Sequence, residues 1–215
     1  MEKELLRSHN TSITLNVTGN RIDSYREKEE TTNTVRVYQD GKIGIAGSLG
    51  ALDEEALTAA AEEALQYGIP YPCHLSEGAA REENHEREIV PQAEFLPRMQ
   101  HLLDRLGEAC PRFSFSNKIK LIHNDNTYEN SRGTRYRASN DSLLLSLIIQ
   151  NRGSGNLFDC AYGMQTDHLD EDAIVADCSK MYDAFYRDVD LEDGEYPVFM
   201  VPGELLGVMI RHFIG

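Results

Sequence analysis

The sequence predicts an α+β fold in which antiparallel β-meanders carry helices packed on one side. Three observations support this class. Residues 11–48 alternate apolar and polar side chains, which is the period-2 pattern of half-buried strands. Helical patterns occur at 53–68, 95–109 and 170–187, each with an apolar stripe. Strand patterns return over 113–164, between the second and third helices.

The composition is that of an ordinary globular protein. The chain has 215 residues and a mass of 24.3 kDa, which suits one large domain or two small ones. Its 21 Lys and Arg residues against 36 Asp and Glu residues give a net charge of −15. This charge argues against a general binder of nucleic acid or anionic membranes, because both are polyanions. It suits a soluble protein or one that meets a basic partner.

The four cysteines lie far apart and form no CxxC pair: Cys73, Cys110, Cys160 and Cys178. Such spacing is neither a disulfide framework nor a zinc ribbon. We expect reduced thiols in or near the core of a cytosolic protein. The first ten residues contain no apolar segment typical of a secretion signal.

The first strands are expected to form an antiparallel meander over 11–48. Apolar residues alternate with polar ones in three short runs: Ile13, Leu15 and Val17, then Val35 and Val37, then Ile43 and Ile45. Asp40-Gly41 separates the last two runs. It predicts a type I′ hairpin, because both residues tolerate a positive φ.

A helix is predicted over 53–68. Asp53 can cap its N-terminus, and Gly68 can supply a left-handed C-terminal cap. Its apolar face is formed by Leu57, Ala61, Ala64 and Leu65. Residues 69–91 lose this periodicity and are dense in charge, so we expect a solvated loop or connector.

A second helix is predicted over 95–109. Pro97 fits its first turn, where a missing N–H is harmless, and Pro111 ends it. Its apolar stripe consists of Phe95, Met99, Leu102, Leu103 and Leu106.

Further strands follow the second helix. Phe113–His123 alternates, Asn124–Asn126 is a cluster of turn-forming residues, and 127–139 is polar and strand-like. Leu143–Ile149 is a continuous apolar run, which predicts a central strand buried on both faces. A glycine-rich turn then leads to a strand over 158–164.

The end of the chain carries a different pattern. After the third helix, an acidic connector over 188–195 leads to a short strand and a final helix that is apolar nearly all round. Such a helix is normally buried, yet it reaches Gly215 without a cap or polar tail. We therefore expect one domain over 1–195 and the start of a second, truncated domain over 196–215.

A local basic strand is the most distinctive polar motif. Arg132, Arg135 and Arg137 occur with Tyr128 and Tyr136 nearby. The simpler interpretation is an exposed strand face paired with acidic neighbours. The functional alternative is a groove for an acidic or extended peptide.

Other motifs are weaker. The segment 46–50 lacks the first glycine of a G-x-S-x-G nucleophile elbow, so we interpret it as a turn. The histidines form no H-E-x-x-H or H-x-H pattern. His74 and His85 lie near many carboxylates, but a solvated loop explains them more simply than a metal site.

Three stretches resemble the TldD/PmbA family and occur in the family's order. Val35–Gly68, with its D-G hairpin and Ala- and Glu-rich helix, resembles the N-terminal signature. Ile119–Ser139 resembles the second hairpin region, and Tyr196–Gly215 resembles the strand and helix where TldD-type members carry their metal motif. The resemblance implies a PmbA/TldD N-terminal-domain-like fold. It also implies part of a cytoplasmic metallopeptidase assembly that acts on peptides, in which members continue into a β-rich second half.

The resemblance further implies where metal ligands would stand. TldD-type subunits carry H-E-x-x-x-H on that helix, so that two His and one Glu reach a single zinc. The alignment puts Arg211 at the first His and His212 at the Glu, and a permanently charged Arg cannot ligate zinc. We therefore expect the PmbA (TldE) type, with no catalytic or metal-binding residues of its own and zinc only in an HExxxH-bearing partner.

The expected partners follow from this resemblance. They are a TldD-like subunit in a homo- or heterodimer and a peptide substrate, in the cytoplasm, without direct contact to nucleic acid or membrane. The alternative is an acidic protein-interaction module that binds a basic or DNA-associated protein, as the family's older label, modulator of DNA gyrase, suggests. A third hypothesis is an active peptidase with ligands such as His123, His168 or His212, whose spacing gives it no support.

Overall fold

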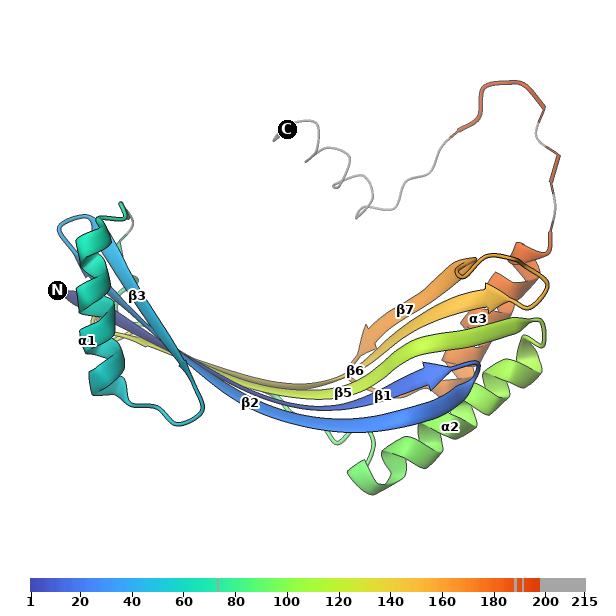
Figure 1. Ribbon diagram of the computed structural model, residues 1–215, viewed down its shortest axis with the longest axis horizontal. Coiled ribbons are helices and arrows are strands. Elements are labelled where there is room, and N and C mark those ends of the chain that lie inside the picture. The colour runs from blue at the N-terminus through green and yellow to red at the C-terminus, as the bar shows by residue number, and fades with distance from the viewer. Residues whose placement is uncertain (73, 188, 191, 198–215) are drawn as a thin grey trace. The chain divides into compact units, whose positions relative to one another are not determined.

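The computed structural model describes residues 1–72, 74–187, 189–190 and 192–197. Most of these belong to one compact unit, Met1–Asp183, which is built on a seven-stranded sheet (Figure 1). The second unit, Ala184–Gly215, lies largely outside the described residues. The elements are β1 (Glu2–Thr18), β2 (Arg21–Gln39), β3 (Lys42–Leu49), α1 (Glu54–Ala64), the 3-10 turn η1 (Leu65–Tyr67), β4 (Ala80–His85), α2 (Gln92–Ala109), β5 (Phe113–Asn130), β6 (Arg135–Asn151), β7 (Cys160–Thr166) and α3 (Glu171–Phe185).

Four long strands form the body of the sheet. The strand order is β3-β2-β1-β5-β6-β4, and β7 also pairs with β6. Two strands therefore share the outer edge of β6. There β4 runs parallel to Arg135–Asn140, and β7 runs antiparallel to Leu143–Ile149. The predicted α+β class with antiparallel meanders is confirmed, with β4 as one parallel addition.

The prediction of a solvated loop over 69–91 is wrong for its middle part. Ala80–His85 forms β4, whose backbone pairs with that of β6. Most of its side chains are exposed, so the sequence there shows no alternation of apolar and polar residues. The parallel ladder, rather than a buried face, holds this strand.

Two tight hairpins build the first three strands. Asp40 and Gly41 have φ of 51° and 71°, as the type I′ prediction requires. Gly19 and Asn20, at φ of 59° and 69°, form an equivalent turn between β1 and β2. The first strand begins at Glu2 rather than at residue 11, so the meander is longer than predicted.

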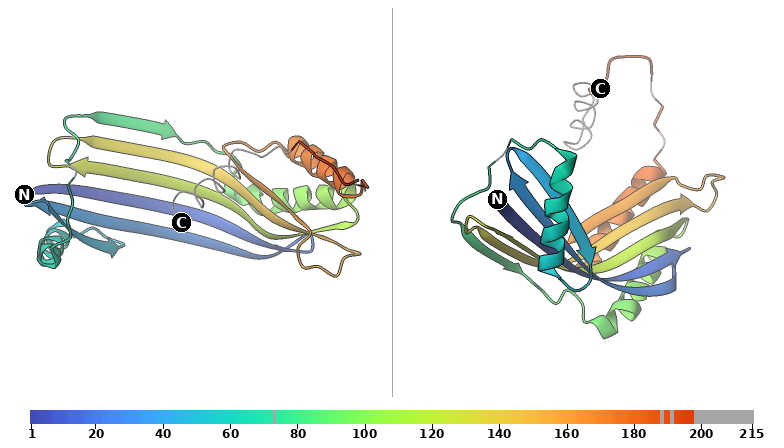
Figure 2. Two further views of the ribbon diagram at one scale, coloured as in Figure 1. Left: turned by 90° about the horizontal axis from the view of Figure 1, so that it is seen from above. Right: turned by 60° about the vertical axis from the view of Figure 1, so that its left-hand side comes forward.

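The helices pack on one face of the sheet, as predicted. Near the start of β1, Leu5 belongs to the apolar cluster that includes residues of α1. Near the end of β1, Leu15 and Val17 are buried. Residues an even number of positions apart in an unbroken strand share a face, so both ends of this face are apolar. Figure 2 shows α1 at one end of the strands, and α2 and α3 toward the other.

The α1 end has a small apolar cluster of Leu5, Val35, Val37, Leu57 and Ala61. The capping prediction holds, because the Asp53 Oδ1 atom accepts a hydrogen bond from the Ala56 N–H at 3.0 Å and Gly68 has φ of 68°. A close approach of helix and strand is possible because position 44 is glycine. A Cβ atom there would lie 1.9 Å from the Ala61 carbonyl oxygen.

The larger apolar cluster lies under α2 and α3. The whole predicted stripe of α2 is buried: Phe95, Met99, Leu102, Leu103 and Leu106. The helix begins at Gln92, however, so Pro97 lies in its second turn rather than in its first. In α3, Ile174 and Cys178 are buried.

Two strand predictions need correction. Asn124–Asn126 is no turn, because β5 continues through it to Asn130 and the chain reverses at 131–134, where Gly133 has φ of 85°. The strand over Leu143–Ile149 is central but not buried on both faces, since Ile148 is 37% exposed. Turn-forming residues tolerate a strand when ladder bonds on both sides hold them.

Several other predictions can be placed. Residues 46–49 belong to β3 rather than to a turn, and Asn33 Nδ2 donates to Ser48 Oγ at 3.3 Å. Cys110 and Cys178 are buried thiols and Cys160 is partly buried. Cys73 and residues 198–215, including Arg211 and His212, lie outside the described residues, so the domain boundary at 195/196 stays a prediction. No helix in the described part of the chain has the length and apolar character needed to cross a membrane.

Candidate functional site

Polar side chains occupy the middle of the helix-bearing face, between its two apolar ends. Strand register places Thr31, His9, Asp125 and Ser139 side by side across β2, β1, β5 and β6. The next row contains Glu29, Thr11, His123 and Asp141. Two grooves open onto this polar zone, one toward α1 and one toward α2.

The groove toward α1, here called the arginine groove, has a volume of about 720 Å³. It is lined by parts of β1, β4, β5 and β6 and by the start of α1. Four of its lining residues are arginines: Arg7, Arg81, Arg135 and Arg137. Glu54, Glu82 and Glu129 also line it, so the groove carries charges of both signs.

Arg137 is held in place by Asp125. Its Nε atom donates to Asp125 Oδ1 at 3.1 Å, and Nη2 donates to Oδ2 at 3.0 Å. This two-point contact keeps the pKa of the Asp125 carboxyl below its ordinary value. The position therefore stays an ion pair, as the simpler sequence interpretation expected.

Arg7 and Arg135 differ from Arg137. Both side chains are exposed and line the groove, yet neither has an ion-pair partner in the described part of the chain. An Arg guanidinium presents its donors in a planar fork that matches a carboxylate. The groove can therefore bind a carboxylate-bearing segment without first breaking an internal ion pair of these two residues.

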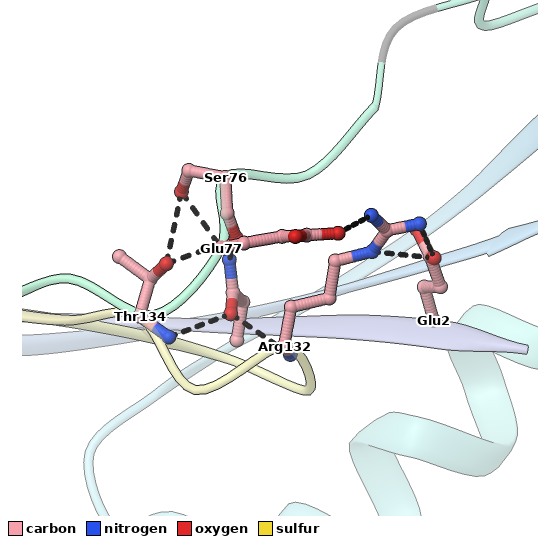
Figure 3. A network of polar contacts seen from close by, with 6 residues as sticks. Glu2, Ser76, Glu77, Arg132 and Thr134 are labelled. Carbon is pink, nitrogen blue, oxygen red and sulfur yellow. Dashed lines mark hydrogen bonds and ion pairs between the residues drawn. The ribbon is translucent and has the colours of Figure 1, made fainter.

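Arg132 lies outside this groove and has a structural role. Its guanidinium donates to Glu2 Oε1 at 2.7 Å through Nε and to Glu77 Oε1 at 2.5 Å through Nη1 (Figure 3). The turn also contacts the 69–78 segment through Thr134 Oγ1, which donates to the Ser76 carbonyl at 2.9 Å. These contacts tie the β5–β6 turn to the start of β1 and to the 69–78 segment.

The two predicted tyrosines are also among the residues that line the groove, but their hydroxyl groups bind other partners. Tyr128 donates to Glu4 Oε1 at 2.6 Å, and Tyr136 donates to Glu83 Oε2 at 2.9 Å. Both bonds lie on the opposite face of the sheet from Arg135 and Arg137, because Tyr136 alternates with these arginines along β6 and register places Tyr128 beside Tyr136. The Tyr136 pKa is raised chiefly by its bond to Glu83, whereas the Tyr128 pKa is raised first by burial. Period-2 geometry alone could have separated the two sets in the sequence.

The groove toward α2, here called the histidine groove, has a volume of about 850 Å³. His123 Nδ1 lies 2.9 Å from Asp141 Oδ1, and the other carboxylate oxygen of Asp141 accepts from the Arg87 backbone N–H at 2.7 Å. Four more carboxylates line the groove: Glu27, Glu29, Glu86 and Glu88. Lys28 and Arg87 are its only lysine and arginine among the described lining residues.

A His–Asp pair orients an imidazole and can support proton transfer. Within the described residues, however, no Ser, Thr or Cys side chain is hydrogen-bonded to His123. The described residues also contain no group of three or more His, Cys, Asp or Glu side chains placed to hold a metal ion. His168, one of the alternative ligands, instead contacts Asp167 and Thr166. Charged side chains line both grooves.

Comparison with known proteins agrees with this fold. A family described as PmbA/TldA metallopeptidase domain 1 matches residues 4–67. No curated protein matches the sequence.

Solved structures match over most of the chain. A candidate modulator of a DNA gyrase from Thermotoga maritima aligns with a TM-score of 0.64 and 15% identity, over 83% of this chain and 43% of that one. TldE from Thermococcus kodakarensis gives 0.62 and 15%, over 85% and 44%. A candidate gyrase modulator from Bacteroides thetaiotaomicron gives 0.56 and 14%, over 84% and 44%.

The chain spans less than half the length of these structures. At such identities, the structural similarity establishes the fold, while the sequence match over β1, β2, β3 and α1 points to the family. Together they support the resemblance of this chain to the N-terminal portion of TldD/PmbA-family proteins.

Proposed function

We propose that this chain is the N-terminal part of a non-metal-binding subunit in a cytoplasmic metallopeptidase assembly. The observation that carries the proposal is the match of residues 4–67 to a metallopeptidase-family domain. The printed 215 residues contain no HExxxH sequence. In this proposal zinc resides in a TldD-like partner subunit, and the chain helps to hold the peptide that the partner cleaves.

The arginine groove supports a role in holding peptides. Arg7 and Arg135 offer guanidinium groups without an ion-pair partner among the described residues, and Glu54, Glu82 and Glu129 can receive backbone amides or a basic side chain. A peptide has both kinds of group. We therefore propose that the groove orients an extended peptide chiefly through its carboxylates.

The subunit role is tested on the natural full-length protein, purified alone and together with an HExxxH-bearing partner. We expect no tightly bound zinc and no peptide hydrolysis from the protein alone, and hydrolysis from the pair. Metal analysis and a quenched fluorescent peptide library measure both. One equivalent of tightly bound zinc, or hydrolysis by the lone protein, would refute this role.

The groove is tested in the active pair with the double variant R7Q/R135Q. For a peptide with an acidic residue we expect KM to rise about tenfold with little change in kcat, because the groove positions substrate and does not touch the reacting atoms. Arg21→Gln is the matched control, since Arg21 is an exposed arginine at the other end of β2. Equal effects of the double variant and the control would contradict the proposal.

The histidine groove favours a second candidate function, an acidic module that binds a basic or DNA-associated protein. Five carboxylates line it against one lysine and one arginine. Association through such a groove would weaken steeply with salt, because the attraction between exposed charges is screened. A pull-down from the natural host, repeated at several salt concentrations, tests this. A partner whose capture does not change with salt would exclude the acidic-module function.

A further inference from the structure

The sheet face opposite the helices carries a group of cations in an otherwise acidic molecule. Register places Arg26 of β2 beside Thr14 of β1, and Thr14 beside Lys120 of β5. The next row contains Ser24, Asn16 and Lys118. No described helix covers this side of the sheet in the half that carries α2 and α3 (Figure 1).

Side-chain contacts confirm that these residues share a face. Asn16 Nδ2 donates to Ser24 Oγ at 2.6 Å, directly beside the row of Thr14. The neighbouring residues Leu15 and Ile119, one position away in each strand, are fully buried on the other side. We call the surface formed by Thr14, Asn16, Arg26, Lys118 and Lys120 the basic face.

Three cations of this face, Arg26, Lys118 and Lys120, have no ion pair in the described part of the chain. Lys28, in the next row, is paired with Glu30 at 2.7 Å. The row of Glu30 and the row of Ser24 bound this part of the face. Between these two rows, no described strand residue on this face is Asp or Glu. Among the described strand positions between these rows, the three cations therefore have no acidic neighbour on this face.

The spacing of the cations fits an extended peptide. Lys118 and Lys120 are two residues apart on one strand, about 7 Å, which is also the spacing of alternate side chains in any extended segment. Arg26 lies two strands from Lys120, roughly 10 Å across the sheet. Two carboxylates at alternate positions of a bound segment can therefore face Lys118 and Lys120 together.

The neighbouring side chains favour a peptide over a single-stranded nucleic acid. Sheets that bind single strands present aromatic rings on which bases stack. Here Leu144 of β6 borders Lys120, and the hydroxyl and amide groups of Thr14, Asn16 and Ser24 lie on the β1 and β2 side. Such groups hydrogen-bond readily to carboxylates and to peptide backbone.

The overall charge does not prevent this binding at physiological salt. The Debye length is then about 8 Å, so that more distant carboxylates are screened while adjacent cations act at close range. We propose that the basic face binds an extended acidic peptide segment with carboxylates at alternate residues, through Arg26, Lys118 and Lys120. This surface lies on the other side of the sheet from the arginine groove, and the proposal does not depend on a metallopeptidase partner.

The experiment uses the natural full-length protein and a fluorescein-labelled peptide of alternating Glu and Ser. Fluorescence anisotropy at about 0.1 M salt measures its dissociation constant. We expect saturable binding that the triple variant R26Q/K118Q/K120Q weakens about tenfold or more, because each lost charge pair contributes modestly. The cations are on the surface, so the variant is expected to keep the circular dichroism spectrum of the wild type.

A matched control removes charge elsewhere. Lys42 is an exposed lysine at the start of β3, at the other end of the sheet. K42Q should leave the affinity within twofold. No saturable binding, or an equal loss in the control, would overturn the proposal.

Two further measurements separate this proposal from nucleic-acid binding and from the proposed function. A labelled oligothymidylate that binds more tightly than the peptide and loses affinity in the triple variant would assign the face to nucleic acid and overturn the peptide assignment. Failure of the R7Q/R135Q variant to change peptide hydrolysis would count against the proposed function alone, since those residues lie on the helix-bearing face.

Discussion

Glu4 is a buried carboxylate that accepts two tyrosine hydroxyls. It is 7% exposed, and Tyr38 and Tyr128 donate to its two oxygens at 2.5 and 2.6 Å. Arg36 Nη1 lies 3.7 Å from the same carboxylate. Such an acceptor is costly to remove, because its donors are left buried without a partner.

We therefore expect Glu4→Ala to lower the free energy of unfolding by about 1–3 kcal/mol. Chemical denaturation followed by circular dichroism measures the change. Glu83→Ala is the control, because Glu83 accepts a similar bond from Tyr136 at the outer edge of the sheet. If the two variants lower the free energy of unfolding equally, the prediction that burial makes the Glu4 contacts more important is wrong.

Cys178 makes stability depend on alkaline pH. Burial is the main cause that raises its pKa from 9.0 to about 12, helped by the neighbouring Cys110. A group with a raised pKa in the folded state favours folding below its unfolded pKa, and that contribution is lost as pH rises toward the folded value. Unfolding midpoints in urea should thus fall between about pH 9 and pH 12. The decline should be shallower in Cys178→Ala, and an unchanged slope would contradict the assignment.

At the scale of elements, α1 can pack closely on β3 because Gly44 of β3 has no side chain. The Ala61 carbonyl occupies the space that a Cβ atom at position 44 would need. Gly44→Ala must push the helix away from the small apolar cluster, so we expect a loss of about 1–3 kcal/mol, typical of overpacking. Gly163→Ala is the matched control in β7, where nothing lies within 4 Å of the added atom. Urea denaturation measures the free energy of unfolding of the two variants. Equal values would show that α1 can move away from β3 without cost.

The elements show what the sequence alone could predict. The Asp40-Gly41 hairpin, the Asp53 cap and the α2 stripe follow local rules of dihedral angle and period, and all three are confirmed. Pairing between distant strands has no such local signature. It places Asn124–Asn126 inside β5 and turns the charged Ala80–His85 into β4.

The candidate site also combines residues that the sequence predicts with residues that only strand pairing brings together. The basic strand was visible, and Arg135 and Arg137 do line a groove. Arg7, which completes it, gave no sequence signal because it comes from β1 and lies more than a hundred residues away. Whether Arg7 and Arg135 meet a carboxylate within the described residues also depends on where the acidic residues of other strands lie, which only the sheet register defines.

At the scale of the whole molecule, net charge should govern the response to salt. With 36 acidic and 21 basic residues, self-repulsion acts on the folded state. Added salt screens this repulsion and also weakens the surface ion pairs, but exposed pairs contribute little each. We expect the thermal midpoint to rise between about 0.02 and 0.3 M sodium chloride. Differential scanning calorimetry measures it, and a falling midpoint would show that ion pairs dominate.

The pairing of β1 has a consequence for synthesis of the chain. One edge of β1 is filled by β2 as soon as the first hairpin closes, but the other pairs with β5, as in Glu4 with Asn130. Until the ribosome has released that strand, a long row of backbone donors and acceptors stays open on the nascent protein. Such an edge invites pairing with other chains, and closing so distant a contact is slow. A chaperone that shields the growing hairpin would therefore raise the yield of folded protein more than one added after release.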